Sequence, residues 1–272
     1  MFFKNFKVWE TEFAGRKLSV ETGKMAGLAN ASVMVRYGDT NVLCTVTASA
    51  KPREGVDFFP LSVDYEEKMY SVGRIPGSFQ RREGRASEKA ILTSRCIDRP
   101  IRPLFPKDLR NDCSVVATVM SVDPDCSPEI AAMIGVSTAI AISDIPWDGP
   151  ISGVNVGLVD GEIVLNPTLE QRAKTDLNLT VASTADLVAM IEAGGNEISD
   201  DLMFDCIMAG HEENKKIVKF IQGIVDEIGK PKFAYESSDP DPDIMKEIED
   251  FCIEDVKKAL DTDDKLVRDE AL

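Results

Sequence analysis

The sequence Gly73-Arg74-Ile75-Pro76-Gly77-Ser78-Phe79-Gln80-Arg81-Arg82-Glu83-Gly84-Arg85 holds the strongest signal in this chain of 272 residues. The stretch 74–107 around it carries nine basic side chains and three acidic ones, although the whole chain has a formal net charge of −16. A basic island in an acidic protein is hard to attribute to composition. It predicts a surface that faces a polyanion, and phosphodiester chains are the commonest polyanion.

The residue types in 73–85 suit a single-stranded nucleic acid. Glycines let a loop approach a ligand closely, and arginines hold phosphate through paired donors. The ring of Phe79 can stack on any base, which is worth about 1–3 kcal/mol per base. This combination grips a strand without reading its sequence. The alternative is a solvated loop whose phenylalanine packs into the core.

A second basic cluster follows in Arg95-Cys96-Ile97-Asp98-Arg99-Pro100-Ile101-Arg102-Pro103-Leu104-Phe105-Pro106. Arg95 and Arg99 are one helical turn apart, so they point in the same direction on a helix. Arg102 lies beyond the proline, and Asp98 could pair with one of these arginines and fix its direction. The spacing leaves a purely structural set of ion pairs equally open.

Composition excludes several kinds of protein. Hydrophobic residues make up 43% of the chain and charged residues 29%, which is typical of a soluble globular protein. No run of about 18 apolar residues exists, so we expect no membrane span. Six scattered cysteines without a Cys-x-x-Cys pair favour buried free thiols in a cytoplasmic protein. The single histidine, His211, is too little for a zinc cluster, and both the P-loop and the dinucleotide glycine motifs are missing.

Periodicity and turn residues predict an α+β fold, a mixed sheet with helices packed on one face. Asp160-Gly161 predicts a hairpin turn. Residues from about 5 to 67 are expected to form strands, among them 30–35, 41–49 and 58–65. Further strands are expected at 113–122, 151–159, 162–165, 177–182 and 187–193.

Three helical stretches are expected between and after these strands. Ser87 should cap a helix that runs to about Asp98 and stops near Pro100. Ser127 should cap a second helix, whose body, 130–143, is almost entirely small or apolar and should be packed on both sides. The stretch 199–228 predicts one or two amphipathic helices.

The chain changes character after residue 235. Residues 236–272 hold 14 acidic and five basic side chains and begin with a linker rich in Asp and Pro. Helices are expected at 244–260 and 264–272, too few to bury a core of their own. We interpret them as the start of a truncated all-α segment, with a disordered acidic tail as the alternative. The expected divisions are 1–145, 146–235 and 236–272.

The motifs at 73–85 and 97–106 together resemble the first core of bacterial polynucleotide phosphorylases, the polyribonucleotide nucleotidyltransferases. Asp57-Phe58-Phe59-Pro60-Leu61, Ala132-Met133-Ile134-Gly135, Gly149-Pro150-Ile151 and Leu165-Asn166-Pro167-Thr168 add to the resemblance. It covers roughly residues 5–235 and implies a ribonuclease PH-like core, in an N-terminal part (1–145) and a C-terminal part (146–235). The segment 236–272 then resembles the start of that family's helical domain.

The resemblance implies an activity that this segment does not perform by itself. Members of the family degrade RNA, including mRNA, from the 3′ end with inorganic phosphate and release nucleoside diphosphates. The phosphate site and the acidic ligands of Mg²⁺ belong to a second core, so no catalytic, metal-binding or cofactor-binding residue is expected in this chain. The resemblance also implies a homotrimeric ring around a channel, single-stranded RNA as substrate, and a ribonuclease and a helicase as partners in RNA degradation.

Carried over residue by residue, the resemblance gives six RNA-binding residues and two assisting ones. Phe79, Arg81 and Arg82 match the loop that holds RNA in the channel, and Arg85 lies beside it. Gln80 stands where many members have a second aromatic residue. Arg102 completes the expected RNA-binding set. Arg95 and Arg99 match arginines that lean toward the phosphate site of the neighbouring core.

Two other interpretations remain open at this point. The chain could be a non-catalytic RNA-binding or ring-forming subunit of an exosome-like assembly. It could also be an independent single-core ribonuclease PH. The latter needs an acidic pair in the strand 177–184, where only Asp176 borders the strand.

Overall fold

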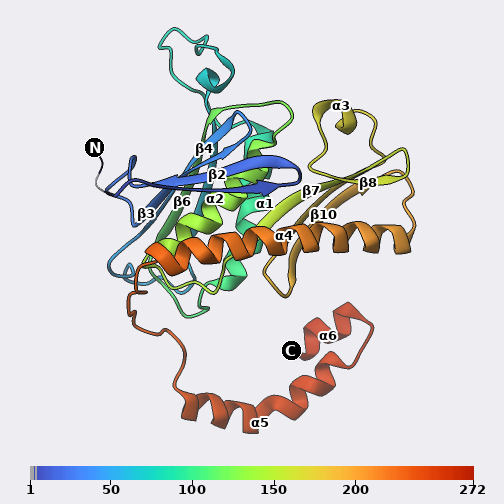
Figure 1. Ribbon diagram of the computed structural model, residues 1–272. Helices are drawn as coiled ribbons and strands as arrows, with labels where there is room; N and C mark the ends of the chain where they lie inside the picture. Colours follow the sequence, from blue (N-terminus) through green and yellow to red (C-terminus); the bar gives the residue numbers. More distant parts are fainter. Residues whose placement is uncertain (1–2, 4) are drawn as a thin grey trace. The chain divides into compact units, whose positions relative to one another are not determined.

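The strands of the first half of the chain form one six-stranded sheet (Figure 1). The computed structural model describes residue 3 and residues 5–272. The strand order is β1-β2-β3-β4-β6-β5, and every neighbouring pair is antiparallel except β5 with β6. The strands are β1 (Lys7–Phe13), β2 (Arg16–Thr22), β3 (Ala31–Tyr37), β4 (Thr40–Ala48), β5 (Leu61–Glu67) and β6 (Cys113–Ser121).

The later strands form a second, separate sheet of four antiparallel strands in the order β10-β9-β7-β8. They are β7 (Ser152–Val159), β8 (Glu162–Leu165), β9 (Leu177–Ser183) and β10 (Val188–Gly195). The predicted hairpin between β7 and β8 is confirmed, because Asp160 and Gly161 both take positive φ, at 52° and 81°. Positive φ at both central residues is what this two-residue turn requires.

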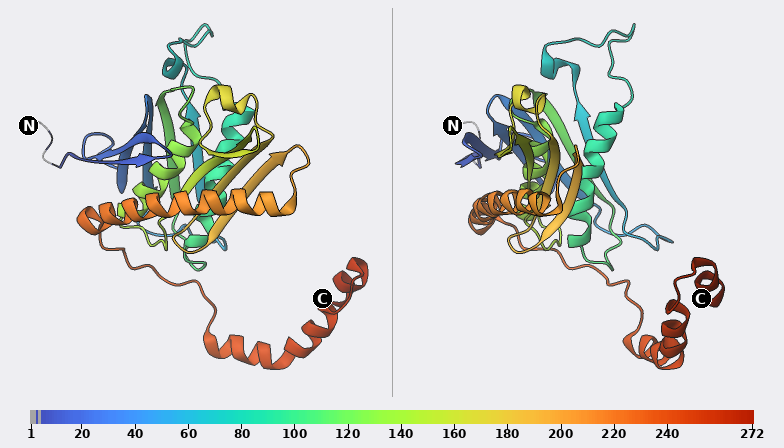
Figure 2. Two further views of the ribbon diagram at one scale, coloured as in Figure 1. Left: turned by 45° about the vertical axis from the view of Figure 1, so that its right-hand side comes forward. Right: turned by 90° about the vertical axis from the view of Figure 1, so that its right-hand side faces the viewer.

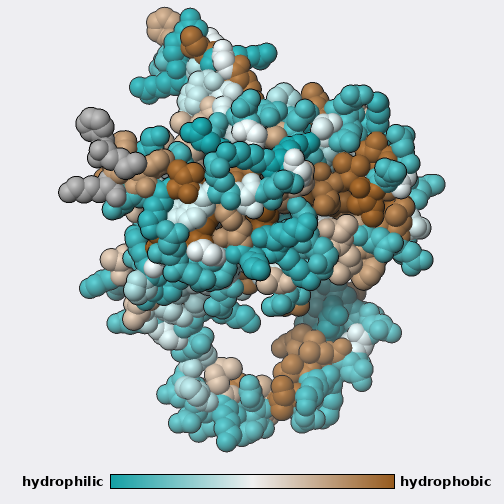
Figure 3. Space-filling view, viewed as in Figure 1, coloured by the Kyte–Doolittle hydropathy of each residue, from teal (hydrophilic) through white to brown (hydrophobic). Residues whose placement is uncertain are grey.

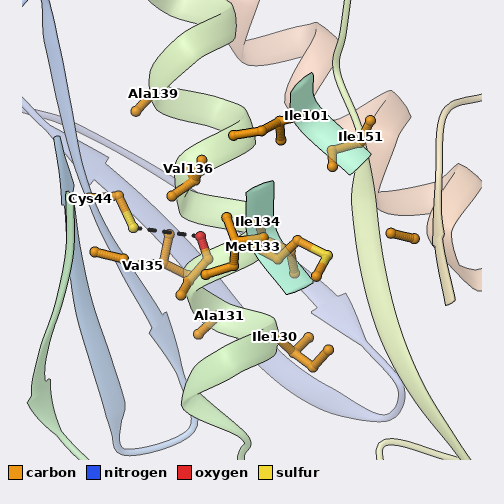
Figure 4. Packing of buried hydrophobic residues seen from close by; sticks show 14 of the residues in the cluster. Val35, Cys44, Ile101, Ile130, Ala131, Met133, Ile134, Val136, Ala139 and Ile151 are labelled. Atoms are coloured by element: carbon orange, nitrogen blue, oxygen red, sulfur yellow. Dashed lines mark hydrogen bonds between the residues drawn. The ribbon is translucent and has the colours of Figure 1, made fainter. Parts of the chain in front are cut away.

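Helix α2 (Pro128–Ile142) lies between the two sheets and is buried along nearly its whole length. It packs on β3, β4 and β6 on one side and on β7 on the other, as predicted from its small and apolar body. Figure 4 shows Val35 and Cys44 on one side of the helix and Ile151 on the other. A Cβ at Gly135 would lie 2.5 Å from the Cys44 sulfur, so this glycine lets the helix and the sheet approach closely.

Helix α1 (Glu88–Ile101) begins as predicted but ends later. The Ser87 hydroxyl accepts a hydrogen bond from Ala90 N, so Ser87 is the N-cap. Pro100 does not stop the helix, which continues to Ile101 and a short 3₁₀ turn, η2 (Arg102–Leu104). Ile101 is fully buried, and its carbonyl accepts a hydrogen bond from Trp147 Nε1 at 3.0 Å. Core packing therefore fixes the last turn although the proline supplies no N–H group.

Ser127 is the N-cap of α2 and Pro128 its first residue, as predicted. The Ser127 side chain makes no cap hydrogen bond; its hydroxyl donates to the carboxylate of Glu129 instead. At the other end of α2, the ammonium of Lys232 donates to Ala141 O and Ser143 O, at 2.9 and 2.7 Å. A basic group is favourable beside the free carbonyls at a helix C-terminus.

One long helix, α4 (Asp200–Ile228), packs on β7 and β9 and crosses the front of the body in Figure 1. A single-turn helix, α3 (Leu169–Arg172), follows β8. The core thus layers a six-stranded sheet, α1 and α2, a four-stranded sheet and α4. The predicted α+β class is confirmed, with α1 and α2 on one face of the first sheet. The division into two sheets was not predicted.

The chain divides into two compact units, Met1–Tyr235 and Glu236–Leu272. The second unit consists of α5 (Pro242–Leu260) and α6 (Lys265–Ala271), where the sequence predicted two helices. The Asp264 carboxylate caps α6 by accepting from Leu266 N. None of the described residues in α5 or α6 is buried, and Phe251 is almost fully exposed. These two helices therefore form no core of their own.

Candidate nucleic-acid interface

The basic loop, residues 73–85, stands away from the core. It follows β5 and a 3₁₀ turn, η1 (Met69–Val72), and it leads into α1. Both views in Figure 2 show it extending beyond the body of the first unit. All its residues are exposed except Pro76, which is half-buried. The ring of Phe79 is completely exposed, so the alternative in which this ring packs into the core is wrong.

The tip of the loop is a tight turn held by hydrogen bonds among its own residues. Arg81 N donates to Ser78 O at 2.9 Å, and the Ser78 hydroxyl donates to Arg82 O at 3.3 Å. Arg81 has a positive φ of 54°, which the turn imposes on a residue that is not glycine. Phe79 and Gln80 occupy the two central positions of this turn. These hydrogen bonds thus hold the backbone of Phe79 at the end of the loop, and its ring is exposed there.

The arginines of the loop have no acidic partner within the described residues. Arg74, Arg81, Arg82 and Arg85 take part in no ion pair among residues 3 and 5–272, and Arg81 Nη1 donates only to Pro76 O, at 3.2 Å. Figure 3 shows a mainly hydrophilic surface on this projection, with isolated apolar side chains. The charges of these four arginines therefore remain available to an external anion.

The arginines of the second cluster differ in their pairing. Arg95 is exposed on α1. Arg99, one turn later, donates to the carboxylate of Glu192 on β10. Arg102 holds both carboxylate oxygens of Asp98, at 2.7 and 3.0 Å, and also donates to Leu61 O. Asp98 therefore pairs with one arginine, as the sequence allowed, and Arg102 has fewer donors left for a ligand than the loop arginines have.

A cavity that the sequence did not reveal lies between α1, the N-terminus of α2 and the second sheet. It has a volume of about 230 Å³, and Cys96, Glu129, Arg172 and Thr180 are among its lining residues. A second cavity of about 480 Å³, on the side of η1, also has Glu129 and Arg172 in its wall. The two cavities adjoin at these two side chains.

Three polar side chains of these cavities are bound to one another. Lys89 Nζ lies 2.7 Å from Glu129 Oε1, and the Ser127 hydroxyl donates to Glu129 Oε2. Burial acts to raise the pKa of the Glu129 carboxyl, but hydrogen bonds from Lys89 and Ser127 outweigh it and hold that pKa below its usual value. Glu129 is thus a paired carboxylate rather than a proton donor.

No metal site is evident in the described part of the chain. Among residues 3 and 5–272 there is no group of three or more His, Cys, Asp and Glu side chains that could hold a metal ion. His211 lies buried on α4, away from the basic loop. No helix in the same residues is long and apolar enough to cross a membrane. The groups that the geometry offers to a ligand are cations and an aromatic ring, which bind anions and bases.

Comparison with known families matches the core. A model of the 3′ exoribonuclease family, domain 1, matches residues 14–146, and a model of domain 2 of the same family matches residues 149–213. Together the two models cover well over half of the chain. Strands β2 to β6 of the first sheet, with α1 and α2, fall in the first match, and the second sheet falls in the second.

Comparison with individual proteins agrees. The chain is 61% identical over 264 residues to a polyribonucleotide nucleotidyltransferase of Ruminiclostridium cellulolyticum, and 56% identical over 262 residues to one of Clostridioides difficile. These alignments cover 97% and 96% of this chain but only 38% and 37% of the relatives. The crystal structure of rice (Oryza sativa) Rrp46 matches with a TM-score of 0.61 at 16% identity, over 82% of this chain and 95% of that one, which shows the fold alone.

Proposed function

Because the chain belongs to the 3′ exoribonuclease family, we propose that it is the first ribonuclease PH-like core of a polyribonucleotide nucleotidyltransferase. This enzyme degrades RNA from the 3′ end with inorganic phosphate and releases nucleoside diphosphates, and it takes part in mRNA degradation. The identity of 61% to such an enzyme supports the proposal. The chain spans a little over a third of the length of the curated relatives it matches, so the activity of the whole protein is part of the proposal.

In this proposal the first core grips RNA, and a second core performs the chemistry. The observation that carries this division is the basic loop, whose Phe79 ring is fully exposed beside arginines that have no acidic partner in the part of the chain that the structure describes. Phe79 stacks on a base, Arg81, Arg82 and Arg85 bind phosphates, Gln80 offers an amide in place of a second ring, and Arg102 contributes through its remaining donors. The tight turn at Ser78 supports this role, because it holds the ring where a strand can reach it.

Arg95 and Arg99 have a different proposed role, beside the phosphate site of the second core. Fixed cations offset the repulsion between free phosphate and the RNA phosphodiester that it attacks. The exposure of Arg95 supports this role, and the pairing of Arg99 with Glu192 gives its guanidinium a fixed direction. Mg²⁺ and inorganic phosphate are the proposed cofactor and co-substrate, bound outside this segment. The second core holds both of them, and Arg95 and Arg99 only assist it.

The assembly proposed is a homotrimer in which three copies of the loop line a channel for single-stranded RNA. The acidity of the chain supports it, because a net charge of −16 discourages RNA from binding elsewhere on the surface. We assign residues 1–145 and 146–235 to the two parts of the core and 236–272 to a linker and the start of a helical domain. A ribonuclease and a helicase are the proposed partners in RNA degradation. The proposed location is the cytoplasm, which the six free cysteines support.

The direct test supplies poly(A), inorganic phosphate and Mg²⁺ to the full-length gene product and to residues 1–272 alone. Nucleoside diphosphates are expected from the full-length protein only. Their release by residues 1–272 would contradict the division of roles between the cores. RNA binding by the full-length protein without any release would instead favour a non-catalytic, ring-forming subunit of an exosome-like assembly.

A further inference from the structure

The basic loop contains a single acidic residue, Glu83, and its carboxylate does not pair with any of the four loop arginines. Instead, Glu83 Oε1 accepts a hydrogen bond from the backbone N–H of Met69 at 2.9 Å. Met69 is the first residue of η1, before the loop begins. The contact therefore joins the end of the loop to the segment from which the loop departs.

Met69 also holds the beginning of the loop. Its carbonyl oxygen accepts a hydrogen bond from Arg74 N at 3.0 Å, while its N–H group donates to Glu83. The two peptide groups that flank the Met69 Cα thus bind both ends of the segment 74–83. These contacts close the segment into a ring through the first residue of η1.

A second contact lies just beyond this closure. The Ser87 hydroxyl donates to Glu67 Oε2 at 3.3 Å, across the same gap between the end of β5 and the start of α1. The pKa of Lys68 is raised, chiefly by its hydrogen bond to Glu66, with a smaller contribution from the Glu83 carboxylate. Glu83 thus belongs to the polar contacts at the base of the loop and not to the charged surface at its tip.

We propose that Glu83 is a positioning residue for RNA binding: its carboxylate holds the two ends of the basic loop together, so that Phe79, Arg81 and Arg82 project as one preformed surface. This inference rests on the proposed function of the loop. No residue of the loop is fully buried, so packing contributes little to its order. An unclosed loop of this kind must be ordered when the RNA binds, and that ordering weakens the binding.

Because Glu83 is negatively charged, a positioning role and a purely electrostatic role predict opposite changes in RNA affinity when it is replaced. A carboxylate among arginines opposes the binding of a polyanion, so an electrostatic role alone predicts tighter RNA binding when it is removed. A positioning role predicts the opposite. Glutamine keeps a carbonyl oxygen that can accept from Met69 N, whereas alanine cannot.

The experiment measures binding of a labelled oligo(A) strand to the full-length gene product and to its Glu83→Ala, Glu83→Gln and Arg82→Ala variants. Glu83→Ala is expected to weaken binding roughly threefold to tenfold although it adds net positive charge, because ordering a few side chains costs that much affinity. Glu83→Gln is expected to bind as well as the wild type or better.

A second measurement reports on the loop without RNA. Trypsin cleavage after Arg74 is expected to accelerate in Glu83→Ala and to stay at the wild-type rate in Glu83→Gln, with unchanged unfolding midpoints in urea. This bond is distant in sequence from the substitution, so the change acts through the closure and not through the local preference of the protease.

The two proposals can fail separately. If Arg82→Ala leaves RNA binding unchanged, the proposed function of the loop is wrong, whatever Glu83 does to the cleavage rate. If Arg82→Ala weakens binding while Glu83→Ala tightens it or leaves it unchanged, the loop binds RNA but Glu83 does not position it. Equal cleavage rates in all variants would likewise overturn the positioning role.

Discussion

Arg102 and Asp98 form a doubly hydrogen-bonded ion pair one helical turn apart, with Nη2–Oδ1 at 2.7 Å and Nε–Oδ2 at 3.0 Å. A further donation from Arg102 to Leu61 O, at 3.1 Å, ties the end of α1 to the start of β5. The side chain of Arg102 is still 42% exposed. A guanidinium that already makes three hydrogen bonds within its own chain is fixed in direction, which limits what it can offer to a ligand.

Replacement of Arg102 by lysine is therefore expected to reduce stability. Lysine keeps the charge but cannot bind both oxygens of Asp98, and the loss should be about 0.5–1 kcal/mol for a pair as exposed as this one. Urea unfolding monitored by circular dichroism measures it. Arg95→Lys on the same helix is the control and should leave the unfolding midpoint unchanged. In RNA binding, Arg102→Ala should weaken affinity less than Arg82→Ala; the reverse order would show that the internal pair does not restrain Arg102.

Phe79 should contribute to RNA binding and not to folding, because its ring contacts no core. Phe79→Ala is expected to weaken binding of oligo(A) to the full-length gene product by about 1–3 kcal/mol for each stacked base. Its unfolding midpoint should equal that of the wild type. Phe204→Ala removes another exposed phenylalanine, on α4, and should leave binding unchanged. Equal losses in the two variants would point to a general effect of surface hydrophobicity. Gln80→Phe, which adds a second ring at the tip, should tighten binding.

Gly135 tests the close approach of α2 to the first sheet. An added Cβ would lie 2.5 Å from Cys44 Sγ and 2.9 Å from Val35 Cγ2, so the helix or the sheet must shift. Gly135→Ala is expected to destabilise the protein by about 1–3 kcal/mol, a typical cost of overpacking. Gly223→Ala, in α4, meets no atom within 4 Å and should stabilise by about 0.5–1 kcal/mol through helix propensity. Denaturant unfolding measures the change in the free energy of unfolding for each variant. Destabilisation by both substitutions would contradict the packing described.

Glu129 should make stability depend on pH on the acid side. Its pKa in the folded chain lies below the usual value, so it contributes stability that is present above the ordinary glutamate pKa. This contribution is lost as the pH falls through the lower, folded-state pKa. Glu129→Gln is expected to be less stable at neutral pH and to lose less stability in acid, as measured by urea unfolding across this range. Glu170→Gln is the control, because Glu170 and its partner Lys174 are both largely exposed to solvent. Parallel curves for wild type and Glu129→Gln would refute the argument.

Local chemistry explains which parts of the fold could be predicted. The Asp160-Gly161 turn, the Ser87 cap and the apolar body of α2 each depend on neighbours in sequence, and all three were predicted. The continuation of α1 past Pro100 depends on Trp147, which is distant in sequence and donates a hydrogen bond to the carbonyl of Ile101. The strand order within the sheets likewise depends on pairings between strands that are distant in sequence, such as β5 with β6.

The candidate interface shows the same contrast. Residue types alone indicated a basic loop with an aromatic ring, and the exposure of Phe79 agrees with a surface role. The partners of Arg99 and Arg102 could not be predicted in full, because Glu192 is distant in sequence and Leu61 contributes only a backbone carbonyl. The sequence does not show the role of Glu83, since its partner is a backbone N–H group. A lone acid among four arginines was the available signal.

The central claim is that the basic loop binds RNA phosphates, and the salt dependence of binding tests it most directly. The measurement compares oligo(A) binding by the wild-type full-length gene product and by its Arg81→Glu/Arg82→Glu variant over a range of salt concentrations. The account predicts weaker binding and a shallower slope, by about 0.7 for each phosphate of the single strand that the variant no longer neutralises. An unchanged slope would contradict it, because the two guanidinium groups would then bind no phosphate.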